Sequence, residues 1–291
     1  MYTFLTYMNT TPHQLTASDG YQLSAQLFKA STPSKALVVI ASATGVPKPY
    51  YSKYAAYLAE TGLFNVLTFD YRGIGESLQG PIKGFDAKMS DWGRLDLQAA
   101  LAWGFDNYEK VFVIGHSVAG QVLPLAELSP RITAVWFVGS QCAANHLWDG
   151  VYRFLVDFFW KVSLPLSSNA LGYMPGIVVG GGPPLPKDAA LEWRSWGLHP
   201  QGIWKDDKAV KEKFEALTIP IHFVSVHDDH MMAPPRAVKF LQTQYSNAET
   251  THQQLKPSDF GLKEIGHFGF FRSRFKDKLW HLPVDFFEPY L

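Results

Sequence analysis

The segment that most constrains the fold of this chain is KVFVIGHSVAGQVLPLAEL, residues 110–128. It begins with a short apolar run, Val111–Ile114, which is too short for a helix and predicts a buried strand. The residues Gly-His-Ser-Val-Ala-Gly follow, and then a pattern that predicts a helix over Gln121–Leu128. A strand, a tight turn with Ser117 at its apex and a helix match the nucleophile elbow G-x-S-x-G, with Ala119 in place of the last glycine.

The chemistry of acyl transfer explains why these residue types occur together. A serine on a strained turn projects its hydroxyl away from the sheet, and small neighbours let the strand and the helix pack closely around it. The start of the helix directs backbone N–H groups and the positive end of its dipole toward an oxyanion. An ordinary strand–turn–helix with an incidental serine is the alternative, because short motifs recur by chance.

The composition favours one large α/β domain with an inserted segment. Of the 291 residues, 47% are hydrophobic and 18% are charged, which predicts a substantial core and no disordered regions. The formal net charge is zero and the sequence has no basic stripe, so nucleic acid is not an expected partner.

Cys142 is the single cysteine of the chain. One cysteine excludes an internal disulfide and a cysteine-based metal site, and it fits a reducing compartment. The N-terminal residues MYTFLTYMNTTPHQL lack the charged region and apolar stretch of a signal peptide. We therefore expect the protein in the cytoplasm.

Short apolar strands alternate with helical patterns along most of the chain. Residues 13–17 and 21–29 predict an antiparallel hairpin around a Ser-Asp-Gly turn. Further strands are predicted at 36–42, 64–70, 132–139 and 219–226, with an edge-like strand at 250–256. Helices are predicted at 50–61, 91–105, 235–245 and 281–290. This alternation indicates an α/β fold with a mostly parallel central sheet that helices cover on both faces.

The alternation stops over residues 145–215, an inserted helical segment between the two parts of the core, residues 1–144 and 216–291. The insertion is rich in aromatic residues: Trp148, Tyr152, Phe154, Phe158, Phe159, Trp160, Trp193, Trp196 and Trp204. A Gly-Gly-Gly-Pro-Pro break at 180–184 is not a phosphate-binding loop, because no strand precedes it and no Gly-Lys-Ser/Thr follows. The insertion either packs its aromatic residues on the core or forms a cap that lines an apolar pocket.

Charged residues also mark the two helical pieces of the insertion. Arg153, Asp157 and Lys161 are four residues apart and form one polar stripe on an otherwise apolar helix. Because a transmembrane helix needs about 20 apolar residues without central charges, we expect no stable membrane insertion. In the second piece, Asp188 is the predicted N-cap.

A serine nucleophile needs a base, and the base needs a carboxylate that orients it. Hydrolases with a nucleophile elbow place the acid after a late strand and the histidine last. Asp228 and Asp229 follow the strand that ends at Val226, and His267 lies in a glycine-rich loop near the end of the chain. We favour Asp229 as the acid because an apolar segment with prolines follows it, and Asp228 is the alternative. His116, beside the nucleophile, is read as a supporting residue.

An oxyanion hole would use the N–H of Val118 and one N–H from the loop after the strand at 36–42. Ala43 is the favoured second donor and Thr44 is its neighbour. A separate reading of His227-Asp228-Asp229-His230 as a metal site is weak, because consecutive ligands point in different directions and no other ligand cluster is evident.

With these residues in place, the chain resembles the α/β-hydrolase superfamily over nearly its full length. It looks most similar to a bacterial group of α/β-hydrolases related to serine aminopeptidase and monoacylglycerol lipase-like enzymes. The matching segments are TASDGYQLSAQLF, SATGVPKPYYSKYAAYLAETG, FDYRGIGES, SDWGRLDL, GHSVAGQ and IGHFGFFR. The resemblance implies a triad of Ser117, Asp229 and His267 that works without a cofactor. The chain departs from the family pattern at Ala119, in a missing His-Gly, and in a longer acid loop.

We therefore expect a serine hydrolase that cleaves a carboxylic ester of small or medium size, with an apolar part, through an acyl-enzyme. A thioesterase or a peptidase would use the same residues, and a non-catalytic binding protein would keep the fold and pocket without the reaction. The expected partner is a small apolar ester, and the sequence gives no indication of the oligomeric state.

Overall fold

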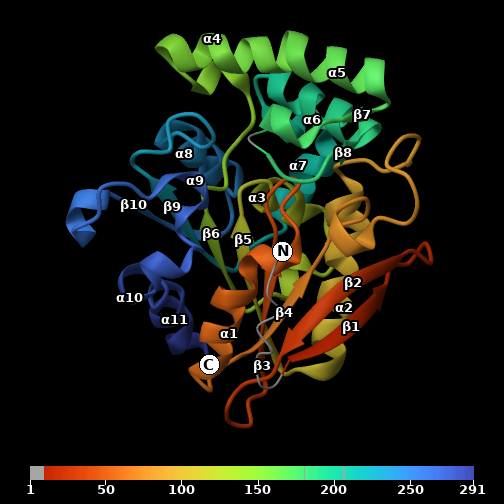
Figure 1. Cartoon of the computed structure of the whole chain (residues 1–291). Helices are drawn as coiled ribbons and strands as arrows, with labels where there is room; N and C mark the ends of the chain where they lie inside the picture. The colour runs from red at the N-terminus through yellow and green to blue at the C-terminus, as the bar shows by residue number, and fades with distance from the viewer. Residues whose placement is uncertain (1–9, 180, 206) are drawn as a thin grey trace.

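The computed structural model of the protein describes residues 10–179, 181–205 and 207–291. Residues 1–9, which begin the segment that lacks a signal-peptide pattern, lie outside the described residues, as does Gly180 of the glycine break. Figure 1 shows a central sheet with helices on both faces and a further group of helices at one end of the molecule.

Eight strands form the central sheet in the order β1-β2-β4-β3-β5-β6-β9-β10. β1 and β2 form the predicted hairpin, β2 is antiparallel to β4, and the remaining neighbours run parallel. The bounds are β1 Thr10–Thr16, β2 Gln22–Phe28, β3 Ala36–Ala41, β4 Asn65–Phe69, β5 Lys110–His116, β6 Ala134–Val138, β9 Pro220–Val226 and β10 Glu249–Leu255. This sheet confirms the predicted α/β fold class.

Alternation along the buried strands divides the core between the two faces of the sheet. Val38 and Ile40 of β3 pack in a cluster with residues of α1, α10 and α11. Leu37 and Val39 of the same strand pack in a second cluster with residues of α2, α3 and α8. These helices are α1 Ser52–Glu60, α2 Gln98–Asn107, α3 Ala119–Val122, α8 Pro235–Gln244, α10 Lys276–Leu279 and α11 Leu282–Phe287, with a short α9 at Gly266–Gly269.

The predicted strand–turn–helix is present, but its helix is shorter than the sequence pattern suggests. α3 ends at Val122, and a 3-10 turn at Leu123–Leu125 follows instead of a helix that continues to Leu128. Pro124 explains the difference, because proline has no N–H to donate to a preceding helical carbonyl.

Residues 145–215 include the helices at the upper end of the molecule in Figure 1. One continuous helical rod consists of α4 (Gly150–Phe158), a π-helical turn (Phe159–Ser163) and α5 (Leu164–Leu171). The helices α6 (Lys187–Leu198) and α7 (Lys208–Glu215) lie below this rod in the view. A small hairpin joins the two pieces, with strands β7 (Tyr173–Met174) and β8 (Leu185–Pro186).

The rod carries the predicted polar stripe, since Asp157 forms ion pairs with Arg153 and Lys161 at 3.2 Å each. The prediction of Asp188 as an N-cap is wrong, because α6 begins at Lys187 after Pro186 and Asp188 lies in its first turn. The rod also exposes large apolar side chains: Val151, Phe154, Leu155, Phe158, Val162 and Leu166. Among the described residues, no helix is long and apolar enough to cross a membrane.

Candidate active site

Ser117 lies at the sharp turn between β5 and α3, at the carboxyl ends of the parallel strands. Its φ is +56°, a left-handed conformation that is rare for a residue with a side chain. Within the described ranges, Lys205 is the one other non-glycine residue with a positive φ. The Ser117 N–H donates to the Val138 carbonyl at 3.0 Å, which holds the turn against β6. Strain of this kind often occurs at functional residues.

Small residues on both sides of Ser117 make this turn possible. A Cβ on Gly115 would lie 2.6 Å from the Phe137 ring, and a Cβ on Gly120 would lie 2.6 Å from the Cβ of Ser140. Ala119 is fully buried next to Gly115, so a methyl group fits at the last position of the motif. The departure from a terminal glycine therefore leaves the geometry of the elbow intact.

One ring nitrogen of His267 contacts a carboxylate. Its Nδ1 lies 2.6 Å from Oδ2 of Asp229, and both side chains are almost fully buried. The other carboxylate oxygen of Asp229 accepts the N–H groups of Met232 and Ala233 at 3.1 Å each. A carboxylate held in this way accepts a hydrogen bond from Nδ1–H, and in that tautomer Nε2 carries the free lone pair. Nε2 is buried and has no hydrogen-bond partner among the described residues.

Asp228 has a different role in the same loop. Its Oδ2 accepts the backbone N–H groups of Ile265 and Gly266, at 2.9 and 3.1 Å. The carboxylate therefore holds the backbone that leads into His267 and does not orient the ring. Of the two aspartates between which the sequence left a choice, Asp229 is the one that contacts the imidazole.

The backbone donors near Ser117 differ from the predicted pair at one position. The Val118 N–H donates to no group in the part of the chain that the structure describes, as a free oxyanion donor should. The Ala43 N–H instead donates to Oη of Tyr51 at 2.9 Å, so Ala43 is not available for a substrate oxygen. The N–H of the neighbouring Thr44 has no such bond among the described contacts, and Thr44 lines the same cavity as Ser117. The sequence did not single out Tyr51, whose hydroxyl accepts the Ala43 N–H and thereby excludes Ala43 as a donor.

A cavity of about 910 Å³ opens beside Ser117 and His267. Its walls are mostly apolar, and the inserted segment contributes Trp148, Val156, Phe159, Trp160, Val178 and Trp193. At another part of the wall, polar side chains come from β2, α1 and the turn after β4: Gln26, Ser52, Lys53 and Glu76. The volume and lining are those of a site for a small organic molecule.

Aromatic contacts fix the wall that the insertion supplies. The rings of Trp160 and Trp193 meet edge to face with centroids 4.8 Å apart, and Trp148 Nε1 donates to the Met231 carbonyl at 2.9 Å. A Cβ on Gly197 would lie 2.2 Å from Trp160, so this glycine makes room for the indole. The sequence did not distinguish Gly197 from other glycines. Trp196 is buried and lies outside the cavity lining.

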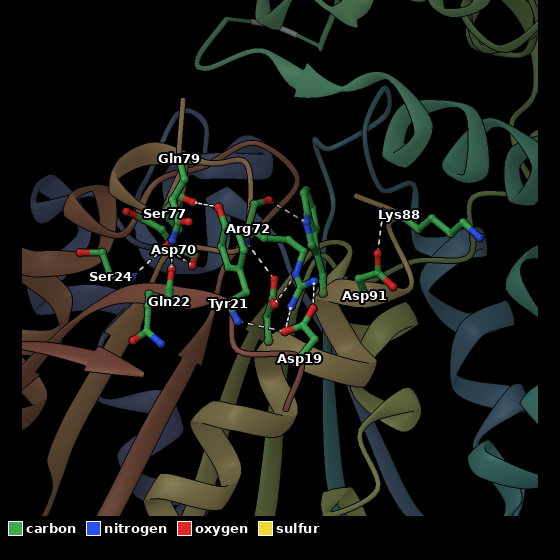
Figure 2. Close-up of polar contacts among 12 residues, drawn as sticks. Asp19, Tyr21, Gln22, Ser24, Asp70, Arg72, Ser77, Gln79, Lys88 and Asp91 are labelled. Carbon is green, nitrogen blue, oxygen red and sulfur yellow. Dashed lines mark hydrogen bonds and ion pairs between the residues drawn. The ribbon is translucent and has the colours of Figure 1, made fainter. Parts of the chain in front are cut away.

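A second group of charges, most of them buried, lies near the turn after β4. Asp96 accepts the Nε and the backbone N–H of Arg72 at 2.7 and 2.8 Å, and Asp19 accepts from the same guanidinium at 2.7 Å. Figure 2 shows Asp19 beside Arg72 and, on the neighbouring loop, Asp70 beside Ser77. Asp70 also accepts the backbone N–H and the ammonium of Lys48, at 2.6 and 3.1 Å. These contacts tie loops together, so residues 70–73 form a structural turn.

The His227–His230 segment does not form a metal-binding group in the structure. The two histidine rings lie 6.2 Å apart, and Asp228 and Asp229 point to different parts of the histidine loop. Across the described residues, no group of three or more His, Cys, Asp or Glu side chains is placed to hold a metal ion.

Comparison with known proteins identifies relatives of the fold. Residues 38–273 match the sequence model of the alpha/beta hydrolase family. The structure is similar to a carboxyl esterase from Bacillus coagulans (TM-score 0.65, 12% identity), with 97% of this chain and 99% of that chain covered. It is also similar to the alpha/beta hydrolase GrgF from Penicillium (TM-score 0.63, 18% identity, 97% and 99% covered). An esterase from Pyrococcus furiosus gives a TM-score of 0.60 at 15% identity, with 97% and 90% covered. No curated protein matches the sequence.

Proposed function

The chain belongs to the alpha/beta hydrolase family, and from this premise we propose that it is a serine hydrolase that cleaves carboxylic esters through an acyl-enzyme. Ser117 is the proposed nucleophile, His267 the base and Asp229 the acid. One observation carries the proposal. His267 is held by Asp229 at 2.6 Å, and its unpartnered Nε2 belongs to a ring that lines the same cavity as the strained Ser117.

In the proposed first step, Ser117 Oγ attacks the ester carbonyl while His267 Nε2 takes the hydroxyl proton. The imidazolium then gives this proton to the alcohol oxygen, the C–O bond breaks, and an acyl group stays on Ser117. A water molecule that gives a proton to the same nitrogen attacks the acyl-enzyme. The carboxylic acid leaves, and the proton returns to Ser117. Asp229 stabilises the imidazolium in both steps.

The proposed oxyanion hole consists of the N–H groups of Val118 and Thr44. Val118 is the N-cap of the helix that follows the nucleophile, and Thr44 lies in the loop after the neighbouring strand β3. Thr44 takes the place of the predicted Ala43 because Tyr51 already accepts the Ala43 N–H. Removal of one such donor in a hydrolase typically lowers kcat by about 10²–10³-fold.

We further propose that residues 145–215 act as a cap that shapes the substrate site. The apolar wall supports a substrate with an apolar acyl or alcohol part, since each methylene removed from water contributes about 0.8 kcal/mol. Two of the similar structures are named as esterases, which favours an ester among the acyl compounds that this site would accept.

A fluorophosphonate probe tests the proposed nucleophile. Wild-type protein should become labelled at Ser117 and should hydrolyse p-nitrophenyl esters, whereas Ser117→Ala should lose both properties with an unchanged melting temperature. The expected loss of kcat is on the order of 10⁴–10⁶-fold. A folded wild-type protein that takes no label would instead be a binding protein on this scaffold. Labelling together with cleavage of thioesters or amides, but not of esters, would change the substrate class.

A series of acyl lengths tests the proposed cap. From acetyl to about butyryl or hexanoyl esters, kcat/KM should rise by roughly fourfold per methylene, as each buried methylene predicts, and then level off. Trp193→Ala should flatten this rise, while Trp196→Ala should leave it in place because Trp196 does not line the cavity. Equal profiles in all three proteins would show that the insertion does not shape the substrate site.

A further inference from the structure

Two buried residues, Tyr51 and His116, lie behind the candidate site and have no place in the proposed reaction. Both side chains are completely inaccessible to solvent, and neither lines the cavity. Tyr51 directly precedes α1, and His116 directly precedes Ser117 at the end of β5. Their contacts connect two parts of the site that come from opposite ends of the chain.

The hydrogen bonds of these two residues have only one consistent set of directions. His116 Nε2 lies 3.1 Å from the His267 carbonyl oxygen, which only accepts, so Nε2 carries a proton. Burial lowers the pKa of His116 well below its usual value, so the ring is neutral and Nδ1 accepts. The Tyr51 hydroxyl, 2.9 Å from Nδ1, is therefore the donor. Tyr51 Oη in turn accepts the Ala43 N–H at 2.9 Å.

The result is a continuous chain of three hydrogen bonds. It begins at the Ala43 N–H, passes through the Tyr51 hydroxyl and the His116 ring, and ends at the carbonyl of His267. Ala43 precedes the proposed oxyanion donor Thr44, and His267 carries the proposed base. The chain thus connects the backbone of one catalytic element to the backbone of the other.

Neighbouring contacts reinforce this connection. Tyr50, which adjoins Tyr51, donates its hydroxyl to the carbonyl of Phe268, which adjoins His267. The Tyr51 ring meets the Phe271 ring edge to face with centroids 5.0 Å apart. Burial raises the pKa of Tyr51 well above its usual value, so the hydroxyl stays a donor over the working range of an esterase.

We propose that Tyr51 and His116 are positioning residues, which hold the oxyanion donor at Thr44 and the imidazole of His267 at fixed positions relative to each other. This inference rests on the proposed serine hydrolase function. The two residues would act on the transition state and hardly on substrate binding, because the oxyanion donor and the base both act as the tetrahedral intermediate forms.

The test compares two tyrosines of the same helical segment. Tyr51→Phe removes the hydroxyl that joins the two loops. Tyr54→Phe removes a hydroxyl that is equally buried but has no hydrogen-bond partner among the described residues. We expect Tyr51→Phe to lower kcat on the order of 10–10²-fold, the effect of a displaced catalytic group, with KM near the wild-type value. Tyr54→Phe should keep the wild-type kcat.

Two ketone inhibitors add a readout that a merely structural role would not change. A trifluoromethyl ketone forms a tetrahedral adduct with an oxyanion, whereas the matching methyl ketone binds as an intact carbonyl compound. The inhibition constant of the methyl ketone divided by that of the trifluoromethyl ketone measures the preference for the tetrahedral adduct. This ratio should fall in Tyr51→Phe by about the same factor as kcat, and it should keep the wild-type value in Tyr54→Phe. An unchanged kcat and an unchanged ratio in Tyr51→Phe would overturn the inference.

A second variant separates a continuous chain from two independent contacts. The short His116→Asn side chain can accept from Tyr51 but cannot reach the His267 carbonyl. If the chain acts as a unit, His116→Asn and the double variant with Tyr51→Phe should lose about as much kcat as Tyr51→Phe alone. A wild-type kcat for His116→Asn, or losses that multiply, would reject the chain. Should Tyr51→Phe fail to fold, His116→Asn carries the test with the same ketone pair.

The outcome is distinguishable from a failure of the proposed function. An active wild type that is labelled at Ser117, together with an undiminished Tyr51→Phe variant, rejects the positioning role alone. A folded wild type without labelling or hydrolysis rejects the hydrolase proposal and this inference with it.

Discussion

Two buried carboxylates in this protein contact basic side chains at short distance. The two pairs differ in whether the basic side chain keeps a nitrogen without a hydrogen-bond partner. Asp229 contacts His267 at 2.6 Å, and Asp96 contacts Arg72 at 2.7 Å. Both aspartates are almost or completely inaccessible to solvent. Distance and burial alone therefore do not separate the candidate catalytic pair from the structural one.

The difference lies in the remaining donors and acceptors. Arg72 contacts Asp96 through its Nε, and both of its terminal nitrogens donate to Asp19. His267 keeps one buried nitrogen without a partner among the described residues, and its ring borders a cavity. We call a pair saturated when every nitrogen of the basic side chain has a hydrogen-bond partner, and open when one nitrogen has none. A saturated pair holds loops together, whereas an open pair beside a cavity is able to transfer a proton.

A shifted pKa does not by itself mark a carboxyl group as catalytic. Burial raises the pKa of Asp96 to about 7 against the opposing effect of Arg72, although the proposed reaction does not use this residue. A perturbed carboxyl group is thus a weak guide to function unless the geometry provides a place for the proton to go.

The largest expected effect is on the pair with the open nitrogen. Asp229→Asn should lower kcat on the order of 10³–10⁴-fold, because an amide at this position favours the wrong imidazole tautomer. Asp228→Asn is the matched control, since it keeps an oxygen that accepts the N–H groups of Ile265 and Gly266. Its loss of kcat should be far smaller. Steady-state kinetics on folded protein measures both, and the reverse ranking would transfer the role of the acid to Asp228.

A smaller effect, and one on a different quantity, is expected at the saturated pair. Arg72→Met leaves the buried carboxylate of Asp96 without its charged guanidinium partner, which should lower the free energy of unfolding by about 3–5 kcal/mol. Because no donor of Arg72 takes part in the proposed reaction, kcat per folded molecule should stay near the wild-type value. Chemical denaturation and active-site titration with the fluorophosphonate measure the two quantities. A fall in kcat comparable to that of Asp229→Asn would remove the contrast between the pairs.

The sequence predicts the fold well because its signals are local. Apolar strands such as 36–42 and 219–226 are recognisable from a few adjacent residues, and the structure places β3 and β9 within them. The elbow is readable for the same reason. Its helix is misjudged because the apolar pattern continues to Leu128, while Pro124 ends the helical hydrogen bonds earlier.

Site residues that differ by one position are harder to choose from the sequence. Which of Asp228 and Asp229 reaches the imidazole depends on contacts with a loop nearly 40 positions later in the chain. Ala43 is excluded as a donor by Tyr51, whose hydroxyl reaches back to it. The same holds for Trp193 and Trp196, since helical spacing puts both near one face but only Trp193 lines the cavity. Such distinctions depend on tertiary contacts, which periodicity does not contain.

The smallest expected effect concerns the ion pair between Lys48 and Glu76, which is open to solvent on one side. Lys48 is buried and also contacts Asp70, whereas the Glu76 side chain is 73% exposed. Hydrogen bonds from Lys48 and Ser24 hold the pKa of Glu76 below its usual value of 4.5. A lowered carboxyl pKa means that the pair stabilises the fold above that usual value and that the contribution disappears as the pH falls through the lowered pKa.

Glu76→Gln should therefore cost less than about 1 kcal/mol at pH 7, since solvent screens exposed pairs, and the cost should vanish at low pH. The free energy of unfolding of both proteins at pH 7 and pH 3 measures this difference. Asp70→Asn is the buried counterpart, because Asp70 is inaccessible and accepts from Lys48 and from the Glu76 backbone. Its cost should be larger and should persist at pH 7 in high salt. Equal costs for the two variants would mean that burial does not determine how much these carboxylates contribute to stability.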